Sequence, residues 1–456
     1  MRNFNILGRS QTNENYMYKY LIILLLPFLL VSCEIATKVE AGNPKPEISM
    51  NENPWPEIRN KRISELLPVA LKDAGVDAWM IVCRENNNDP LADHIGGENA
   101  GGTAAFLFYQ LNGEVSSIVF SPEGEATALA EMEIHDRVVP VERGKSALEE
   151  AVSFIKENQL NTLAINSSKD NSLADGLSYT QRADLEELIK GSDVRLVSSE
   201  EVVYNWLSIK LPEEVEIMKK AAALTAAWQQ EAYSSVIPGE TTDADVARFL
   251  KNKMAAHEVK DGWHPDQNPN VNSGKDRGHS HATDKIIQRG DVIQTDFGIK
   301  VHDRWVTDIQ RFAYVLKEGE TTAPADILYY WESAKKGNRV AMQAMWPGVK
   351  GIDVDRAQRK VMEEAGSAYV MWSTGHPVGY VAHDVGPNLG GSQATHVRPD
   401  SDKLLKEGMT FAFDGFHSWK LPNGDLKTIS VEEMVVITKD GAEYLTPPQE
   451  ELILIK

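Results

Sequence analysis

The chain has 456 residues, of which 42% are hydrophobic, and this is enough for two or three domains with packed cores. Its formal net charge of −20 argues against nucleic acid as a partner, because phosphate binding requires a positive surface. It contains only two cysteines, which excludes a scaffold held together by disulfides.

An apolar run, LIILLLPFLLV, covers residues 21–31. It is shorter than the roughly 20 residues that span a bilayer, and it lies between Lys19 and Ser32, as in a secretory signal peptide. The residues LVSC resemble the lipobox of bacterial lipoproteins, so residues 1–33 are predicted to be a lipoprotein signal peptide, with a transmembrane anchor as the alternative. The resemblance implies a lipid on Cys33 that holds the protein in the bacterial cell envelope, facing the periplasm or the exterior.

Residues 34–53 have no apolar periodicity and are predicted to be a tether. Residues 54–208 are predicted to form an α/β domain, which opens with a helical pattern that ends at Gly75. Further helices are predicted over 147–157 and 182–190, and strands over 78–82, 104–109, 116–120, 163–166 and 194–197. No catalytic residue is predicted in this domain, although Asp93 and His94 in its long loop are considered as additions to an active site.

Residues 209–456 are predicted to form a second domain with an internal duplication. A helix is predicted from Pro212 to Ser235, and a second helix follows the dipeptide Pro-Gly at 238–239. The same order recurs around Pro-Gly at 347–348. This self-similarity predicts a pseudo-two-fold, and a site between the two halves would draw ligands from both.

Two runs, IQTDFG and WVTDIQ, each place an aspartate at the end of a strand pattern. A turn near 302–303 would pair the runs as a hairpin and bring Asp296 close to Asp308. Two like charges at that distance are costly unless a cation neutralises them or one takes a proton. The alternative interpretation is that both aspartates are turn residues at strand ends.

Three later segments repeat this form. The run GHPVG carries His376, with His383 seven residues further on; FAFDG carries Asp414, and VEEMVVIT carries Glu432. Because several strand-like runs each end on a potential ligand, the pattern predicts that these residues converge on one site suited to metal ions.

The combination of TDFG, TDIQR, GHPVG with HDVG, and VEEMVVIT resembles the pita-bread metallopeptidase superfamily, in its creatinase, prolidase and aminopeptidase P branch. The resemblance covers roughly residues 210–445. It implies an α/β N-terminal domain and an α+β pita-bread catalytic domain with the internal pseudo-two-fold duplication. The implied activity is removal of the N-terminal residue from Xaa-Pro peptides. The alternatives are a prolidase-type dipeptidase, a catalytically decayed binding protein and a creatinase-like hydrolase without metal.

The resemblance also implies the roles of single residues. The metal ligands would be Asp296, Asp308, His376, Asp414 and Glu432, with Asp308 and Glu432 bridging two divalent ions. Manganese is expected first, with cobalt, zinc or iron as alternatives. The catalytic residues would be His279 on the substrate side, His383 beside the tetrahedral intermediate and Asp414 as general base, while the role of His281 is open. The implied partners are peptide substrates and, through Cys33, a membrane. A homodimer is also considered.

The chain departs from the family pattern at three points. Asp414 stands where the family has glutamate, and Ser430 stands where it has the arginine that helps to hold the substrate. The spacing of twelve between Asp296 and Asp308 is one longer than usual, which predicts a bulge or a longer hairpin turn.

Overall fold

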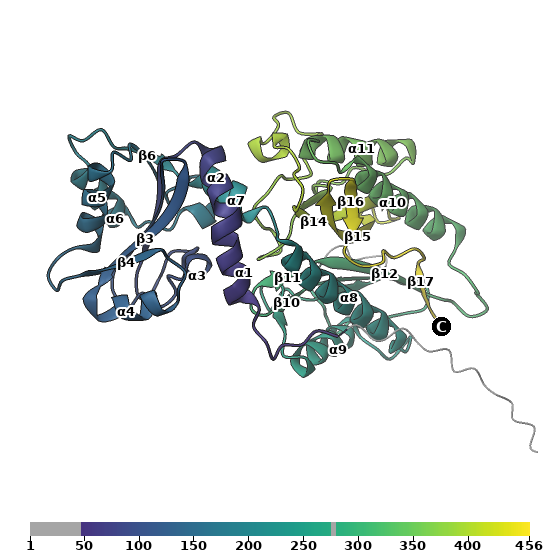
Figure 1. Ribbon diagram of the computed structural model, residues 1–456. Coiled ribbons are helices and arrows are strands. Elements are labelled where there is room, and N and C mark those ends of the chain that lie inside the picture. The colour runs from purple at the N-terminus through teal and green to yellow at the C-terminus, as the bar shows by residue number, and fades with distance from the viewer. Residues whose placement is uncertain (1–46, 275–279) are drawn as a thin grey trace, which may run out of the picture. The chain divides into compact units, whose positions relative to one another are not determined.

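The computed structural model describes residues 47–274 and 280–456 (Figure 1). The predicted signal peptide with Cys33, most of the predicted tether and His279 lie outside these residues. Within them, no helix combines the length and the apolar character needed to cross a membrane. By their contacts Pro46–Lys456 form a single unit, so the predicted domain boundary near residue 208 stays a prediction.

The described chain begins with a long helix that contains a π-turn. Its parts are α1 (Trp55–Lys61), the π-turn η1 (Arg62–Leu66) and α2 (Leu67–Ala74). The predicted helix that ends at Gly75 is therefore confirmed, but it is not regular. A π-turn contains one residue more than the corresponding α-helical turn, and here it carries Arg62, whose side chain is fully buried.

A six-stranded sheet follows, in the order β4-β3-β2-β1-β5-β6. Strands β1, β2 and β3 are antiparallel, whereas β4, β5 and β6 pair in parallel with their neighbours. The strands are β1 (Ala78–Cys83), β2 (Ala104–Leu111), β3 (Glu114–Pro122), β4 (Arg137–Val141), β5 (Thr162–Ile165) and β6 (Arg195–Ser198). The helices of this region are α3 (Ala92–Ile95), α4 (Glu123–Glu131), α5 (Ala147–Glu157), α6 (Tyr179–Leu188) and α7 (Glu200–Leu207).

All five predicted strands and both further predicted helices of this region are present, but α3, α4, β4 and α7 were missed. Strand β4, RVVPV, contains a proline and only one buried residue, because it lies at the edge of the sheet. Helix α4 buries only two residues and so has little apolar periodicity. Strand β4 and helix α4 have weak sequence signals because they cover little of the core, whereas α7 was missed although five of its eight residues are buried.

Two helix pairs connected by Pro-Gly turns confirm the internal duplication. Helices α8 (Pro212–Ser234) and α9 (Asp243–Ala256) form the first pair, and α10 (Ala325–Ala344) and α11 (Gly351–Glu364) form the second. Gly239 and Gly348 both have φ of 86°, a conformation that glycine adopts without steric cost. Each also donates its backbone N–H across 2.8 Å to a later segment of its own half, at Ile287 O and Leu405 O respectively.

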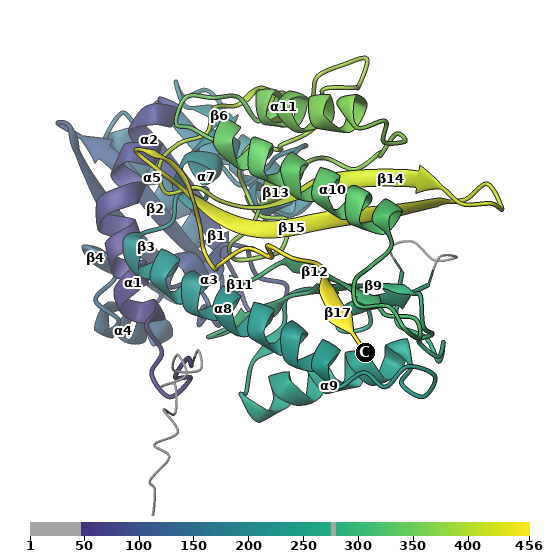
Figure 2. The ribbon, with the colours of Figure 1, turned by 90° about the vertical axis from the view of Figure 1, so that its right-hand side faces the viewer.

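Each half continues into antiparallel strands. The first half contributes β8 (Asn270–Ser273), β9 (Val292–Phe297) and β12 (Ile309–Val315), joined by β17 (Ile453–Ile455), and a small sheet of β7 (Lys260–Asp261), β10 (Ile299–Val301) and β11 (Trp305–Val306). The second half contributes β13 (Gly375–Pro377), β14 (Thr410–Lys420), β15 (Leu426–Thr438) and β16 (Gly441–Tyr444). Helix α10 packs on the long β14–β15 ribbon, and β12 contacts β15 (Figure 2).

Candidate metal centre

The first hairpin brings Asp296 and Asp308 to one face. Asp296, the last residue but one of β9, lies opposite Gln310 of β12, and Asp308 lies two residues before Gln310. Because side chains alternate along a strand, Asp308 and Gln310 share a face, and the two aspartates are diagonal neighbours across the hairpin. The predicted pairing of the two acidic runs is therefore present.

The unusual spacing of twelve is explained by the turn and not by a bulge. Val301 pairs with Trp305, and the three residues between them form the turn, with Arg304 N donating to Val301 O at 3.0 Å. His302 and Asp303 have φ of 50° and 55°. The longer-turn alternative is therefore correct, and the register continues unchanged toward Asp296.

The second hairpin supplies the other pair of acids. Asp414 of β14 and Glu432 of β15 are direct cross-strand partners. His376 of β13 pairs with Ala412, two residues before Asp414, so it lies beside the same stretch of ribbon. Since directly paired side chains are roughly 5 Å apart at Cβ, this register alone places two carboxylates side by side.

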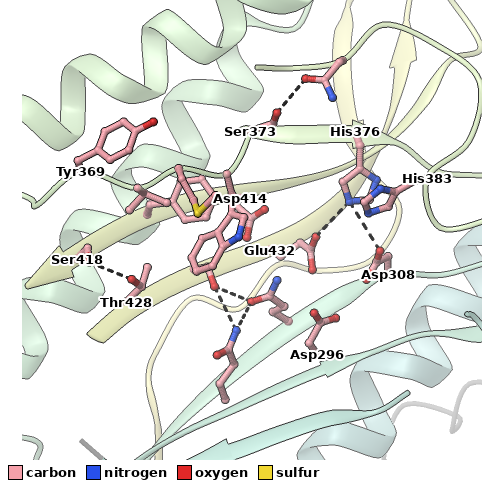
Figure 3. Close-up of a pocket in the computed structure, with 18 of the residues that line it drawn as sticks. Asp296, Asp308, Tyr369, Ser373, His376, His383, Asp414, Ser418, Thr428 and Glu432 are labelled. Atoms are coloured by element: carbon pink, nitrogen blue, oxygen red, sulfur yellow. Dashed lines mark hydrogen bonds and ion pairs between the residues drawn. The ribbon is translucent and has the colours of Figure 1, made fainter. Parts of the chain in front are cut away.

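The two hairpins meet at one cluster, which Figure 3 shows. One ligand atom each from Asp308, His376 and Glu432 lie within 4.8 Å of one another, an arrangement that could hold a metal ion. His376 Nε2 is 3.8 Å from Asp308 Oδ2 and 3.9 Å from Glu432 Oε1. Asp296 and Asp414 line the same cavity. All five predicted ligands are therefore together, while their individual roles stay predictions.

The electrostatics of the cluster fit divalent cations. Burial, and then the neighbouring acids, raise the pKa values of Asp308, Asp414 and Glu432 well above the ordinary values for carboxyl groups. Asp414 Oδ1 and Glu432 Oε2 are also buried without a hydrogen-bond partner among the described residues. Leaving such oxygens unsatisfied is costly, so the donor set matches hard cations that prefer oxygen ligands.

The two histidines are held neutral. Burial, and then the nearby His383, lower the pKa of His376 to about 4. Burial also lowers the pKa of His383, whose ring centroid is 4.1 Å from that of His376. A neutral imidazole is the form that binds a metal ion, so His376 is ready to be a ligand at neutral pH.

A relay of amides and a hydroxyl supports Glu432 and was missed by sequence reasoning. Gln310 Oε1 accepts hydrogen bonds from Gln294 Nε2 and from Ser430 Oγ, both at 2.6 Å. The Gln310 oxygen already accepts two hydrogen bonds, so the amide nitrogen of Gln310 is available to donate to Glu432. This hydrogen bond lowers the pKa of Glu432, whereas burial and the neighbouring acids raise it. Ser430 therefore has a defined partner where the family has arginine. The available signal was the position of Gln310, two residues after Asp308.

A buried charge cluster lies behind His383. Arg62 Nη1 is 2.6 Å from Glu214 Oε2, and Tyr380 Oη donates to Glu214 Oε1 at 2.5 Å. Asp384, next to His383, accepts from Tyr380 N at 2.8 Å and pairs with Lys210 Nζ at 3.3 Å. The loop that carries His383 is thus fixed from behind by charges on the first helix and on α8. Sequence periodicity did not indicate this role, because it registers apolar positions and not buried ion pairs.

The remaining predicted candidates lie away from the cluster. Asp93 forms an ion pair with Arg304, and His94 is buried with its ring centroid 4.8 Å from that of Tyr380. Neither is among the described residues that line the cavity. His281 is exposed and does not line the cavity either, so its role stays open.

The cavity that contains the cluster has a volume of about 640 Å³. Its lining changes in character with distance from the acids: Phe416, Ser418 and Thr428 continue along the ribbon, and Tyr369 and Trp372 form part of another wall. Arg398, which is exposed, also lines it. The site therefore combines an acidic, buried end with a less acidic region that contains several aromatic side chains.

Comparisons with known proteins agree with this geometry. Residues 216–439 match the model of metallopeptidase family M24. The Xaa-Pro dipeptidase of Pyrococcus furiosus is 25% identical over 327 residues, covering 71% of this chain and 83% of that protein. The Xaa-Pro dipeptidase of Pyrococcus horikoshii is 24% identical over 404 residues, covering 87% and 100%. The crystal structure of an X-Pro aminopeptidase from Thermotoga maritima superimposes with a TM-score of 0.63 at 20% identity, over 85% of this chain and 100% of that one.

Proposed function

Because the chain belongs to the pita-bread metallopeptidases, in the branch of creatinase, prolidase and aminopeptidase P, we propose that it is a metal-dependent exopeptidase that hydrolyses Xaa-Pro peptides. The observation that carries this proposal is the meeting of two acid pairs with His376 in one buried cluster. Four carboxylates so close together are tolerated only with protons or cations among them. Retention of this cluster argues against the decayed and the metal-free alternatives.

The residues of the chain divide the chemistry between them. Asp296, Asp308, His376, Asp414 and Glu432 would hold two divalent ions, which supply Lewis-acid polarisation of the scissile carbonyl and an activated water. Asp414, which lines the cavity together with the other ligands, would accept the proton of that water. His383, whose ring lies beside that of His376, would donate a hydrogen bond to the oxyanion.

Dipeptides are the first substrates to consider. The dipeptidase names of the relatives support them, and so does Arg398 on the cavity lining, since a guanidinium binds a free carboxylate well. A second candidate is an aminopeptidase that acts on longer Xaa-Pro peptides. It is favoured by the extension of the cavity along the ribbon, past Phe416 to Ser418.

The test is a substrate panel with the full-length protein in detergent, loaded with manganese, cobalt, zinc or iron. We expect release of the first residue from Ala-Pro and none from Ala-Ala-Ala. Elemental analysis of the same preparations should find about two ions per chain. Absence of turnover with every metal, together with less than one bound ion, would refute the proposal and favour a binding protein.

We also propose that the protein is lipid-anchored through Cys33 in a bacterial envelope. The motif LVSC carries this proposal. Metabolic labelling with a palmitate analogue should mark the wild type and not Cys33→Ser, while Cys83→Ser serves as the control. Equal labelling of wild type and Cys33→Ser would exclude a lipid at this position.

A further inference from the structure

The β14–β15 ribbon forms a floor that leads away from the metal cluster. Its cross-strand pairs in sequence are Asp414 with Glu432, Phe416 with Ser430, and Ser418 with Thr428. All six side chains line the cavity, as expected for alternate positions on one face. Figure 3 shows Ser418 and Thr428 on the ribbon at the opposite side of the view from His376 and Asp308.

The length of this floor exceeds what a dipeptide fills. Asp414 and Ser418 are four residues apart on a strand, which corresponds to about 13 Å at roughly 3.3 Å per residue. An extended peptide covers at most about 3.6 Å per residue. The floor beyond the cluster can therefore hold about three residues in extended form.

Only the substrate residues that follow the scissile bond can lie along this floor. An exopeptidase that releases one residue keeps the free amine of the substrate close to the reacting centre. Residues that extend away from the centre are then those that follow the scissile bond. The outer floor would meet the third residue and any that come after it.

The wall above the outer floor is apolar and exposed. Tyr369 and Met371 are 65% and 77% exposed, although both are large apolar side chains that line a cavity. Leu426, at the start of β15, lines the same region and is 44% exposed. Apolar groups gathered beside a catalytic centre usually mark a surface that is covered by a ligand.

This wall is held in place before any substrate arrives. Arg359 Nη1 donates to Val370 O at 2.9 Å, and its Nη2 donates to Trp372 O. Arg359 is itself paired with Asp355 at 3.2 Å, and Asp355 accepts from Thr374 Oγ1 at 2.6 Å. The backbone on both sides of Met371 is therefore fixed from α11, so little ordering is needed on binding.

We propose that Tyr369, Met371 and Leu426 form a subsite for an apolar side chain at the third position of a peptide substrate. The proposal rests on the proposed exopeptidase function and extends it to tripeptides and longer peptides with a stated preference. The preference arises because the exposed apolar surface of the three side chains is removed from water when an apolar residue covers it.

The test compares kcat/KM for Ala-Pro-Phe and Ala-Pro-Ser, with Ala-Pro as reference. We expect the wild type to prefer the phenylalanine peptide by about tenfold, which is the effect of partly burying one aromatic side chain. In the double variant Tyr369→Ser, Met371→Ser the ratio of the two tripeptides should fall toward one. Tyr179→Ser, which changes a tyrosine that is 89% exposed outside the cavity, should keep the wild-type ratio.

The outcomes separate this proposal from the function on which it rests. Turnover of Ala-Pro without turnover of either tripeptide, or a ratio that the double variant leaves unchanged, overturns the subsite and leaves the exopeptidase standing. Absence of turnover with all three peptides overturns the exopeptidase. In that case, calorimetric binding of the two tripeptides to the metal-loaded protein still decides the subsite, since equal affinities would refute it.

Discussion

Two neighbouring ion pairs allow the role of burial to be measured directly. Lys61 pairs with Glu213 at the surface, and the next residue along each helix, Arg62, pairs with Glu214 in the interior. Arg62→Met and Lys61→Met remove one cation each and keep a long unbranched side chain. We expect a large loss of stability from the first change and no measurable loss from the second.

The magnitude follows from the contacts of Arg62. Its guanidinium donates to Glu214 Oε2 at 2.6 Å, to Ile209 O at 2.8 Å and to Trp206 O at 2.5 Å, and the side chain is fully buried. When Arg62 is removed, Glu214 stays buried and its carboxylate keeps hydrogen bonds from Leu211 N, Trp305 Nε1 and Tyr380 Oη. Breaking a buried pair by removal of one partner costs about 3–5 kcal/mol.

The assay is urea unfolding followed by tryptophan fluorescence, together with steady-state kinetics on Ala-Pro. Arg62→Met should unfold at a clearly lower urea concentration than Lys61→Met. Because Tyr380 joins Glu214 to the loop of His383, we also expect kcat to fall more than KM rises. If Arg62→Met unfolds together with Lys61→Met, the buried cluster does not contribute as described.

Three further predictions concern the metal cluster. Ser430→Ala should weaken Mn²⁺ binding by about tenfold, because Gln310 loses one of the donors that orient it toward Glu432; Thr428→Ala, on the same face of β15, is the control, and equal affinities would contradict the relay. Asp308→Ala should lose metal and activity, whereas Asp414→Glu should keep both, as elemental analysis and turnover will show; full activity of Asp308→Ala would exclude its bridging role. In chelated protein these carboxyl groups have a higher pKa in the folded state than in the unfolded state, so the folded state binds their protons more tightly. The stability of the chelated protein therefore rises as the pH falls from above the raised pKa values toward the unfolded values near 4. The increase in Tm on adding Mn²⁺ should therefore be larger at about pH 8 than at about pH 6; a larger increase at the lower pH would contradict the cluster electrostatics.

Local patterns were enough to predict the frame of the site. A strand that ends in an acid, next to a turn, constrains its partner strand, so the meeting of Asp296 with Asp308 was predicted from sequence. The Pro-Gly repeat likewise predicted two halves, because each of the two Pro-Gly turns connects a pair of helices in the same order. The position of Gly298 follows the same logic: a Cβ there would lie 2.0 Å from Thr307 O, so the close approach of the two runs requires glycine.

Long-range polar contacts could not be predicted in this way. Gln294, Gln310 and Ser430 become a relay only when β9, β12 and β15 are side by side, and nothing in a single segment specifies that arrangement. Arg62 and Glu214 are separated by 152 residues. Within its own segment, neither differs from an ordinary charged residue of a helix. Their function depends on burial, which the complete fold determines.

The π-turn at Arg62–Leu66 has a consequence for how this chain is compared with others. One additional residue in a helix shifts the phase of every side chain beyond it by about 100°. Before the shift, Trp55 and Arg59 face α3, with Arg59 Nη1 donating to Asp93 O; after it, α2 packs against α7. A homologue that lacks this one residue would present a different face of α2 to α7, so a single-residue gap at this point would mark a different packing of these two helices.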